Sequence, residues 1–472
     1  MYIKEGIEDN RIRNCMTLVN ERRFTMKRFI FSILILVIFW SMGHAQETDT
    51  SKSPELVTAA RGFIDLLVKN DFAGGTATFD STMKAAMPAD KLEDAWKSLI
   101  GEVGPFKNQG EAHIQKVRQY DVVAITCQFE KSPLDIQVTF DNKKNIAGLF
   151  FTPTKPKADY KEPSYVNPKA FREMHRQIGT DEWALPGTLT LPIGPGPFPA
   201  VVLVHGSGPN DRDESIGPNK PFRDIAEGLA SQGIAVLRYD KRTMVYGQKL
   251  MENMDSLTAK EETIDDAIRA IELLRSTVGI DSTKVFILGH SLGAMLAPRI
   301  AAQDADIAGL IIMAGATRPL EDVILDQFNY IYSLNGAMND QQKAEIEKIR
   351  QQVNKVKDPA LSPAVASSEL PLGMPARYWL DLRGYNPGVV ADKLNKPILV
   401  LQGERDYQVT KIDFDGWKKA LSNHKNVEFR LYPKLNHLFI EGEGKSTPSE
   451  YENADNVSVD VINDIAAWIK KR

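Results

Sequence analysis

Ser291 stands in the run Gly-His-Ser-Leu-Gly at residues 289–293, with a glycine two positions away on either side. The apolar run at 284–288 predicts a strand that ends here, and residues 294–303 predict a helix that begins directly afterwards. A turn this sharp holds the serine in a strained backbone conformation, and larger side chains at the glycine positions would clash. The turn also places the serine at a helix N-terminus, whose free N–H groups favour a developing oxyanion. The run therefore predicts a nucleophilic serine, and a turn without chemistry is the alternative.

A serine hydroxyl is a poor nucleophile until a base takes its proton, so a histidine must lie nearby in the fold. His437 follows the last predicted strand, at residues 427–432, and the base stands last in the chain order typical of such serines. His290 is expected to point its side chain away, and His205 belongs to a different motif. We therefore predict His437 as the general base.

The imidazole needs a carboxylate that orients it. Asp406 lies just past the end of the next-to-last predicted strand, at the sheet edge where the serine and the histidine are expected. Glu404 is its nearest rival, and Asp413 is more remote. The predicted triad is therefore Ser291, Asp406 and His437, in the chain order nucleophile, acid, base.

A tetrahedral intermediate needs N–H donors for its oxyanion. The backbone of Leu292, directly after the nucleophile, is predicted to supply one of them. The run His-Gly-Ser-Gly at 205–208 follows the predicted strand 199–205 and is a known setting for the other, for which we predict the backbone of Ser207. The glycines of this run also suit a tight turn, and both interpretations can hold.

Further polar and aromatic residues are candidates for substrate contact. The charged run at 211–214 favours a structural ion cluster over substrate binding, and the run at 239–242 is expected to brace the site rather than to contact substrate. Tyr378 and Trp379 are candidates for the lining of the acyl or alcohol pocket, and the alternative is that they form the interior of the segment that carries them.

The elements that must position these residues alternate between strand and helix along residues 169–472. The predicted strands are continuous apolar runs, which are typical of a parallel sheet buried on both faces. An antiparallel pair, at 171–178 and 185–191, precedes the alternation. Residues 318–390 interrupt it with a helical and then a proline-rich segment, which predicts a cap over the carboxyl edge of the sheet.

A separate small domain is predicted at residues 53–153, followed by a linker at 154–168 that contains several prolines and lysines. Helices at 55–69 and 89–100 come first, and four strand-like runs follow between residues 113 and 151. Helices followed by an antiparallel sheet indicate an α+β domain.

The first 45 residues carry the features of a secretory signal peptide, with a basic pair at 27–28 and an apolar run at 29–40. We expect Met26 to be the true start, cleavage between Ala45 and Gln46, and a periplasmic or secreted mature protein. An uncleaved membrane anchor is the alternative. The apolar run is shorter than the roughly 20 residues of a spanning helix, so no stable membrane insertion is expected after cleavage.

Composition argues against several other classes of protein. The 472 residues are 43% hydrophobic and 25% charged, as in ordinary soluble proteins, and the formal net charge of −4 lacks the basic character of a nucleic-acid-binding protein. Two cysteines, Cys15 and Cys127, are too few for a disulfide framework or a cysteine-based metal site. We therefore expect no nucleic-acid partner, no disulfide framework and no cysteine-based metal site.

These motifs together resemble a known family. Residues 171–472 resemble the α/β-hydrolase superfamily, and the loop at 205–213, the serine run and the upstream small domain together resemble bacterial esterases of the EstD type. The small domain resembles the DUF3887 type, and an NTF2-like cone is one shape that this resemblance allows for it. The resemblance implies an α/β-hydrolase fold and hydrolysis of short-chain acyl esters without a metal or an organic cofactor.

The predicted activity is therefore that of a serine carboxylesterase acting on a small-molecule acyl ester through an acyl-enzyme. A serine peptidase of the prolyl-oligopeptidase or iminopeptidase kind is the nearest alternative, because it uses the same triad. The 97 residues at 54–150 are too few for the propeller domain of such a peptidase. A non-catalytic binding protein on a hydrolase scaffold is the third possibility, and the intact Ser, His and Asp argue against it.

Overall fold

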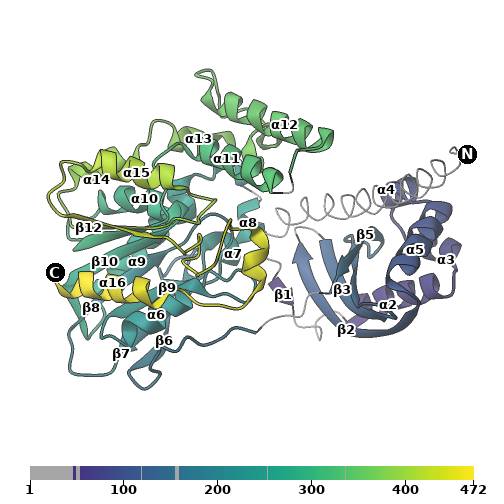
Figure 1. The fold of residues 1–472 in the computed structure, drawn as a ribbon, viewed down its shortest axis with the longest axis horizontal. Helices are drawn as coiled ribbons and strands as arrows, with labels where there is room; N and C mark the ends of the chain where they lie inside the picture. Colours follow the sequence, from purple (N-terminus) through teal and green to yellow (C-terminus); the bar gives the residue numbers. More distant parts are fainter. Residues whose placement is uncertain (1–45, 49–53, 118–119, 155–158, 252, 335) are drawn as a thin grey trace, which may run out of the picture. The chain divides into compact units, whose positions relative to one another are not determined.

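The computed structural model describes residues 46–48, 54–117, 120–154, 159–251, 253–334 and 336–472 (Figure 1). The chain divides into two compact units, residues 1–156 and 157–472. The predicted signal peptide and its cleavage site at Ala45 lie outside the described residues, apart from Gln46 on the far side of the cleavage site.

Among its described residues, the first unit contains the short strand β1, then four helices, then strands β2 to β5, and the strands form one antiparallel sheet with the order β1-β2-β3-β4-β5. This is the α+β arrangement that the sequence predicts. The bounds are β1 Gln46–Thr48, α2 Pro54–Val68, α3 Phe72–Ala77, α4 Ser81–Ala86, α5 Ala89–Val103, β2 Phe106–Val117, β3 Tyr120–Phe129, β4 Leu134–Phe140 and β5 Ile146–Pro153.

A single apolar core holds this unit together. Phe63 on α2 and Trp96 on α5 are buried against alternate residues of the strands, such as Ile136 and Val138 on β4. The sequence analysis did not predict the short helices α3 and α4, because six residues are too few to show a helical period. Aspartates cap both of them, and the cap of α3 is Asp71, which accepts the Gly74 N–H at 2.8 Å.

The second unit is built on one eight-stranded sheet with the order β13-β12-β11-β10-β8-β9-β7-β6 (Figure 1). Strands β8 to β13 are parallel, whereas β7 pairs antiparallel with both β6 and β9. The mostly parallel sheet and its antiparallel edge confirm the predicted fold. The bounds are β6 Phe171–Ile178, β7 Leu185–Pro192, β8 Phe198–Val204, β9 Ala235–Tyr239, β10 Ile280–His290, β11 Gly309–Met313, β12 Ile398–Gly403 and β13 Val427–Tyr432.

Helices cover both faces of this sheet. Val201 and Leu203 of β8 face the helices α6 and α16. Their neighbours Ala200, Val202 and Val204 face the opposite layer, formed by α9, α10, α14 and α15. Because alternate residues of a strand point to opposite faces, covering both faces requires a continuous apolar run. The bounds are α6 Pro221–Ala230, α7 Arg242–Val245, α8 Gly247–Met251, α9 Asp265–Arg275, α10 Leu292–Ala301, α14 Pro387–Lys393, α15 Lys411–Ala420 and α16 Val459–Lys470.

The predicted insertion folds into helices of its own between β11 and β12. They are α11 Leu320–Ser333, α12 Asp340–Lys357 and α13 Ala376–Leu382, which lie together at the top of the second unit in Figure 1. Asn339 caps α12 in a reciprocal capping box with Gln342, which explains why the sequence marks the start of this helix so clearly. A small apolar core of its own, including Ile324 and Trp379, holds the cap together.

The turn between β10 and α10 crosses neighbouring backbone at very short range. A Cβ atom added to Gly293 would lie 2.1 Å from the carbonyl oxygen of Val204 on β8. A Cβ atom added to Gly289 would lie 2.3 Å from the carbonyl oxygen of Gly293. Both obstacles are backbone atoms and cannot rotate aside, so both positions require glycine.

Replacing Gly293 with alanine is therefore expected to destabilise the second unit by about 3 kcal/mol or more, since the new methyl group forces β8 and α10 apart. The free energy of urea-induced unfolding, followed by tryptophan fluorescence, measures this effect. Gly247→Ala is the matched control, because a Cβ at Gly247 meets no atom within 4 Å. Equal stability of the two variants would contradict the crossing described above.

Candidate active site

Ser291 occupies the turn between β10 and α10 in a conformation that is rare for a residue with a side chain. Its backbone angles are φ 54° and ψ −115°. The Ser291 N–H donates to the Met313 carbonyl on β11 at 2.9 Å, which ties the turn to the sheet. Leu292 is the first residue of α10, so its N–H has no partner within the helix and is free to bind an anion.

His437 and Asp406 form a buried pair at the carboxyl edge of the same sheet. The imidazole Nδ1 lies 2.7 Å from the Asp406 Oδ2, and both side chains are almost fully buried. The Asp406 carboxylate also accepts the backbone N–H of Val409 at 3.0 Å and the side-chain amide of Gln402 at 3.1 Å. These bonds fix the carboxylate, which in turn fixes the imidazole with Nδ1 as the donor.

The loop that carries His437 is bonded to the residue beside Ser291. The His290 Nε2 lies 3.0 Å from the His437 carbonyl oxygen, and the two imidazole rings are 4.7 Å apart between centroids. The three residues predicted as a triad therefore follow β10, β12 and β13 at one sheet edge, and His290 joins the serine turn to the histidine loop.

His290 itself is held by the buried carboxylate of Glu214, which in the sequence is only one member of the charged run at 211–214. The His290 Nδ1 lies 2.8 Å from the Oε2 of Glu214, which is 2% exposed. Both ring nitrogens thus face an acceptor, an arrangement that favours the doubly protonated, charged ring. Burial opposes this charge, but the Glu214 carboxylate raises the pKa of His290 above its usual value.

The loop after β8 lies against the nucleophile. A Cβ added to Gly206 would be 3.1 Å from the Cβ of Ser291, and the Gly206 N–H donates to Glu214 at 2.6 Å. Ser207 is exposed, and among the described residues none accepts a hydrogen bond from its N–H. An exposed and unpaired N–H beside the serine is what an oxyanion donor requires.

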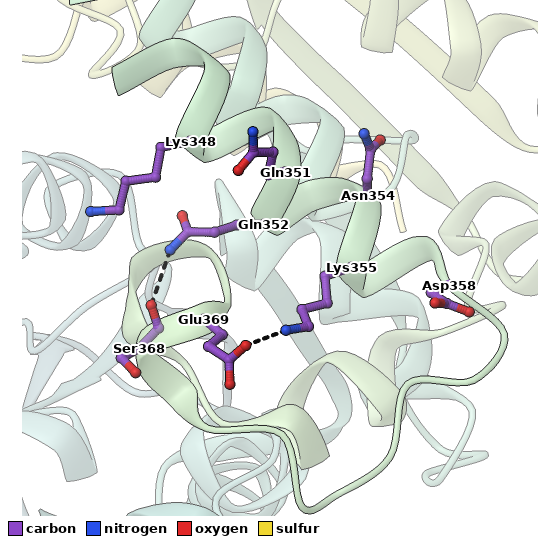
Figure 2. Close-up of a pocket in the computed structure, with 8 residues that line it drawn as sticks. All are labelled: Lys348, Gln351, Gln352, Asn354, Lys355, Asp358, Ser368 and Glu369. Carbon is purple, nitrogen blue, oxygen red and sulfur yellow. Dashed lines mark hydrogen bonds and ion pairs between the residues drawn. The ribbon is translucent and has the colours of Figure 1, made fainter. Parts of the chain in front are cut away.

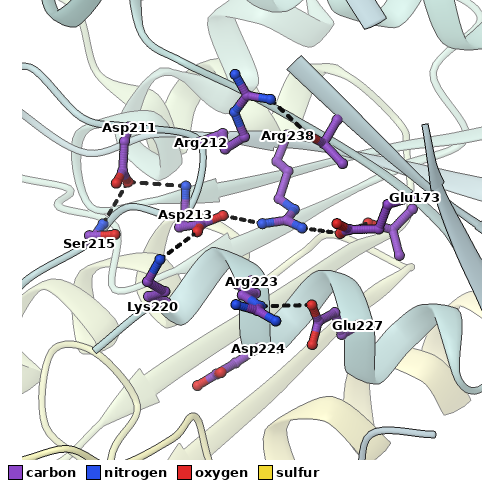
Figure 3. Close-up of polar contacts among 12 residues, drawn as sticks. Glu173, Asp211, Arg212, Asp213, Ser215, Lys220, Arg223, Asp224, Glu227 and Arg238 are labelled. Atoms are coloured by element: carbon purple, nitrogen blue, oxygen red, sulfur yellow. Dashed lines mark hydrogen bonds and ion pairs between the residues drawn. The ribbon is translucent and has the colours of Figure 1, made fainter. Parts of the chain in front are cut away.

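The other charged residues of this loop bind groups of the same unit rather than facing open space (Figure 3). Asp213 pairs with the buried Arg238, which also pairs with Glu173 on β6, and Lys220 lies 3.1 Å from Asp213. Asp211 accepts the backbone N–H of Ser215 at 2.9 Å. The run at 211–214 is therefore structural, as its composition favoured, with Glu214 as the member that reaches the site.

Tyr378 and Trp379 are both buried, at 2% and 1% exposure. The Tyr378 hydroxyl donates to Glu262 at 2.7 Å, and Trp379 belongs to the apolar core of the cap. Trp379 thus fits the interior of the cap, whereas Tyr378 packs in the core between the sheet and the helices of its α9 and α10 face. A polar groove of about 510 Å³ does lie on the cap, between α12 and the turn that carries Glu369 (Figure 2), but none of the predicted site residues lines it.

The chain is similar to known proteins over most of its length. The profile of the family described as "Serine aminopeptidase, S33" matches residues 197–443, and that of a "Protein of unknown function (DUF3887)" matches residues 60–149. Esterase EstD of Thermotoga maritima is 41% identical over 413 residues, which cover 87% of this chain and 94% of that protein. The chain belongs to this family of serine hydrolases.

Two solved structures show a more distant similarity to the chain. An esterase of Pyrococcus furiosus has a TM-score of 0.41 at 16% identity, covering 67% of this chain and 97% of that one. The acylaminoacyl peptidase of Pyrococcus horikoshii has a TM-score of 0.44 at 13% identity, covering 79% of this chain and 57% of that one.

Among the residues that the structure describes, no three His, Cys, Asp or Glu side chains gather as a metal site. Over the same residues, no helix has the length and apolar character needed to cross a bilayer.

His205, directly after β8, is a third buried histidine, in addition to His290 and His437. It is 1% exposed, its Nε2 donates to the Asp211 carbonyl at 3.1 Å, and its Nδ1 is buried without a hydrogen-bond partner among the described residues. Burial lowers the pKa of His205 to about 4, against an ordinary value of 6.5. The folded protein therefore holds a neutral ring where the unfolded chain takes up a proton.

This difference predicts a loss of stability in acid. The contribution of the neutral ring is complete above pH 6.5 and falls as the pH drops from 6.5 towards 4, because only the unfolded state is protonated in that window. His205→Gln should therefore lose less unfolding free energy than the wild type between pH 7 and pH 5 in urea titrations. His175→Gln, at an exposed histidine, is the control. An equal loss in wild type and His205→Gln would contradict the assignment.

Proposed function

We propose that the protein is a serine carboxylesterase that hydrolyses short-chain acyl esters, with Ser291 as nucleophile, His437 as base and Asp406 as the orienting acid. The observation that carries the proposal is the buried pair of His437 and Asp406, bonded through His290 to the serine turn. The 41% identity to a protein named an esterase supports the ester as substrate. No step of the proposed reaction uses a cofactor.

In the first step, His437 takes the hydroxyl proton of Ser291 while the serine oxygen attacks the ester carbonyl carbon. The carbonyl oxygen becomes an oxyanion, which accepts hydrogen bonds from the backbone N–H groups of Leu292 and Ser207. His437 then gives its proton to the departing alcohol, and an acyl-serine remains. Asp406 keeps the imidazole in the right tautomer and stabilises its charged form.

In the second step, water attacks the acyl-serine while His437 again takes the proton. A second oxyanion forms at the same donors and collapses, which releases the carboxylic acid and returns the proton to the serine oxygen. The sum of both steps is one ester and one water converted to one acid and one alcohol.

The test is hydrolysis of p-nitrophenyl esters from acetate to laurate by the protein from Gln46 onward, beside Ser291→Ala. We expect turnover that is highest for the short esters and falls by about 10⁴-fold or more in the variant, because the nucleophile and its base act as a unit. The control is the circular dichroism spectrum of Ser291→Ala, which should match the wild type.

Other outcomes separate the remaining candidates. Turnover that survives in Ser291→Ala would contradict the nucleophile. The family description names an aminopeptidase, so aminoacyl p-nitroanilides belong in the same assay. A protein inert to esters that cleaves these amides would be a peptidase. A protein inert to both, and to a fluorophosphonate probe, would be a binding protein on a hydrolase scaffold.

We also propose export from the cytoplasm, on the basic pair and apolar run that precede Ala45. Expression of the full chain in a Gram-negative host, followed by fractionation and N-terminal sequencing, tests this proposal. The expected product is a periplasmic or secreted protein that begins at Gln46. An intact N-terminus in the membrane fraction would indicate an anchor instead.

A further inference from the structure

The carbonyl group of Gly206, in the loop beside the nucleophile, accepts a hydrogen bond from a buried ammonium group. Lys241 is 2% exposed, and its Nζ lies 2.8 Å from the Gly206 oxygen. Lys241 comes just after β9, and its own backbone N–H donates to the Asn210 carbonyl at 2.9 Å. A lysine whose ammonium group is buried and donates to a backbone carbonyl is unusual, because burial of its charge is unfavourable.

A carboxylate from another helix compensates this charge. The Lys241 Nζ lies 2.6 Å from the Oε1 of Glu262, whose other oxygen accepts the Tyr378 hydroxyl at 2.7 Å. Glu262 lies in a π-helical turn, Lys260–Ile264, directly before α9. Such turns are often found at functional sites. The ammonium group is thus held in one place by an ion pair, and the Gly206 carbonyl takes a further hydrogen of that group.

The hydrogen bond from Lys241 acts on the peptide group between Gly206 and Ser207. The Gly206 carbonyl and the Ser207 N–H belong to the same planar trans peptide, in which they point in opposite directions. Fixing the oxygen on Lys241 therefore fixes the direction of the Ser207 N–H. A cation on the oxygen also polarises the amide and makes its N–H a stronger donor. The preceding peptide is fixed as well, because the Gly206 N–H donates to Glu214.

We propose that Lys241 is a positioning residue for catalysis, which aims and polarises the Gly206–Ser207 peptide so that the Ser207 N–H stabilises the oxyanion. Glu262 and Tyr378 hold Lys241 in place. The inference rests on the proposed function, since it assigns Lys241 to the same acyl transfer. It differs from a purely structural role, because the effect falls on the transition state and not on substrate or product binding.

The chain offers a matched control for the experiment. Arg242 and Asp266 form a second buried ion pair, with the Arg242 Nε 2.9 Å from the Asp266 Oδ2. This pair also joins the residues after β9 to the start of α9, but among the described residues it makes no hydrogen bond to the loop at 206–208. The test variant Lys241→Met/Glu262→Gln and the control Arg242→Met/Asp266→Asn each remove both charges, so neither leaves an unpaired buried ion.

Three quantities are measured in each variant: kcat/KM for p-nitrophenyl acetate, and the inhibition constants of a trifluoromethyl ketone and of acetamide. The ketone forms an oxyanion adduct on the serine, whereas acetamide is an uncharged analogue of the substrate that forms none. We expect Lys241→Met/Glu262→Gln to lose up to about 10²-fold in kcat/KM, with a parallel weakening of the ketone and unchanged inhibition by acetamide. The control should keep all three values near wild type, with a similar loss of thermal stability.

Each other outcome overturns a different statement. An active wild type and a test variant that matches the control would overturn the role of Lys241 alone. A wild type whose ester turnover does not depend on Ser291 would overturn the proposed function and this inference with it. Should the double variant not fold, Tyr378→Phe removes one bond to Glu262 and leaves both charges in place. An unchanged inhibition constant for the ketone in that variant would also overturn the inference.

Discussion

The close crossing of backbone at the serine turn is the constraint on which the arrangement of the site depends. Gly293 passes the Val204 carbonyl so closely that no side chain fits between them, and Gly289 packs on Gly293 itself. This contact brings the end of β8 against the start of α10. The nucleophile, the N-terminus of α10 and the loop at 206–208 consequently meet at one point of the sheet edge, and Ser291 is held in its strained conformation by the packing around it.

Buried charged side chains connect the loops that this crossing brings together. Glu214 binds the Gly206 N–H and the imidazole ring of His290, and His290 in turn binds the carbonyl of His437. Lys241 binds the Gly206 carbonyl from the other side. The loop, the serine turn and the histidine loop are therefore connected by charge-assisted hydrogen bonds in a region shielded from water, where such bonds are strong and geometrically demanding.

The cap takes part in the same network through one residue. Tyr378 on α13 donates to Glu262, the partner of Lys241. A cap helix is therefore joined to the loop beside Ser291 by a hydrogen bond to Glu262, the ion pair of Glu262 with Lys241, and the hydrogen bond of Lys241 to Gly206. The cap otherwise has its own apolar core. Its position and the direction of the Gly206–Ser207 peptide are therefore linked by direct contacts, in addition to any role of the cap in enclosing substrate.

The sequence by itself determined the family, the fold class, the strands of the sheet and the residues at the ends of those strands, because apolar periodicity and the glycines of a tight turn are local properties. It left Glu214 within a charged run and Lys241 within a segment expected only to brace the site. Their partners, His290 and Gly206, stand 76 and 35 residues away. Only the tertiary structure decided these pairings, because a buried charge selects its partner by position in space, which depends on how the strands are ordered in the sheet.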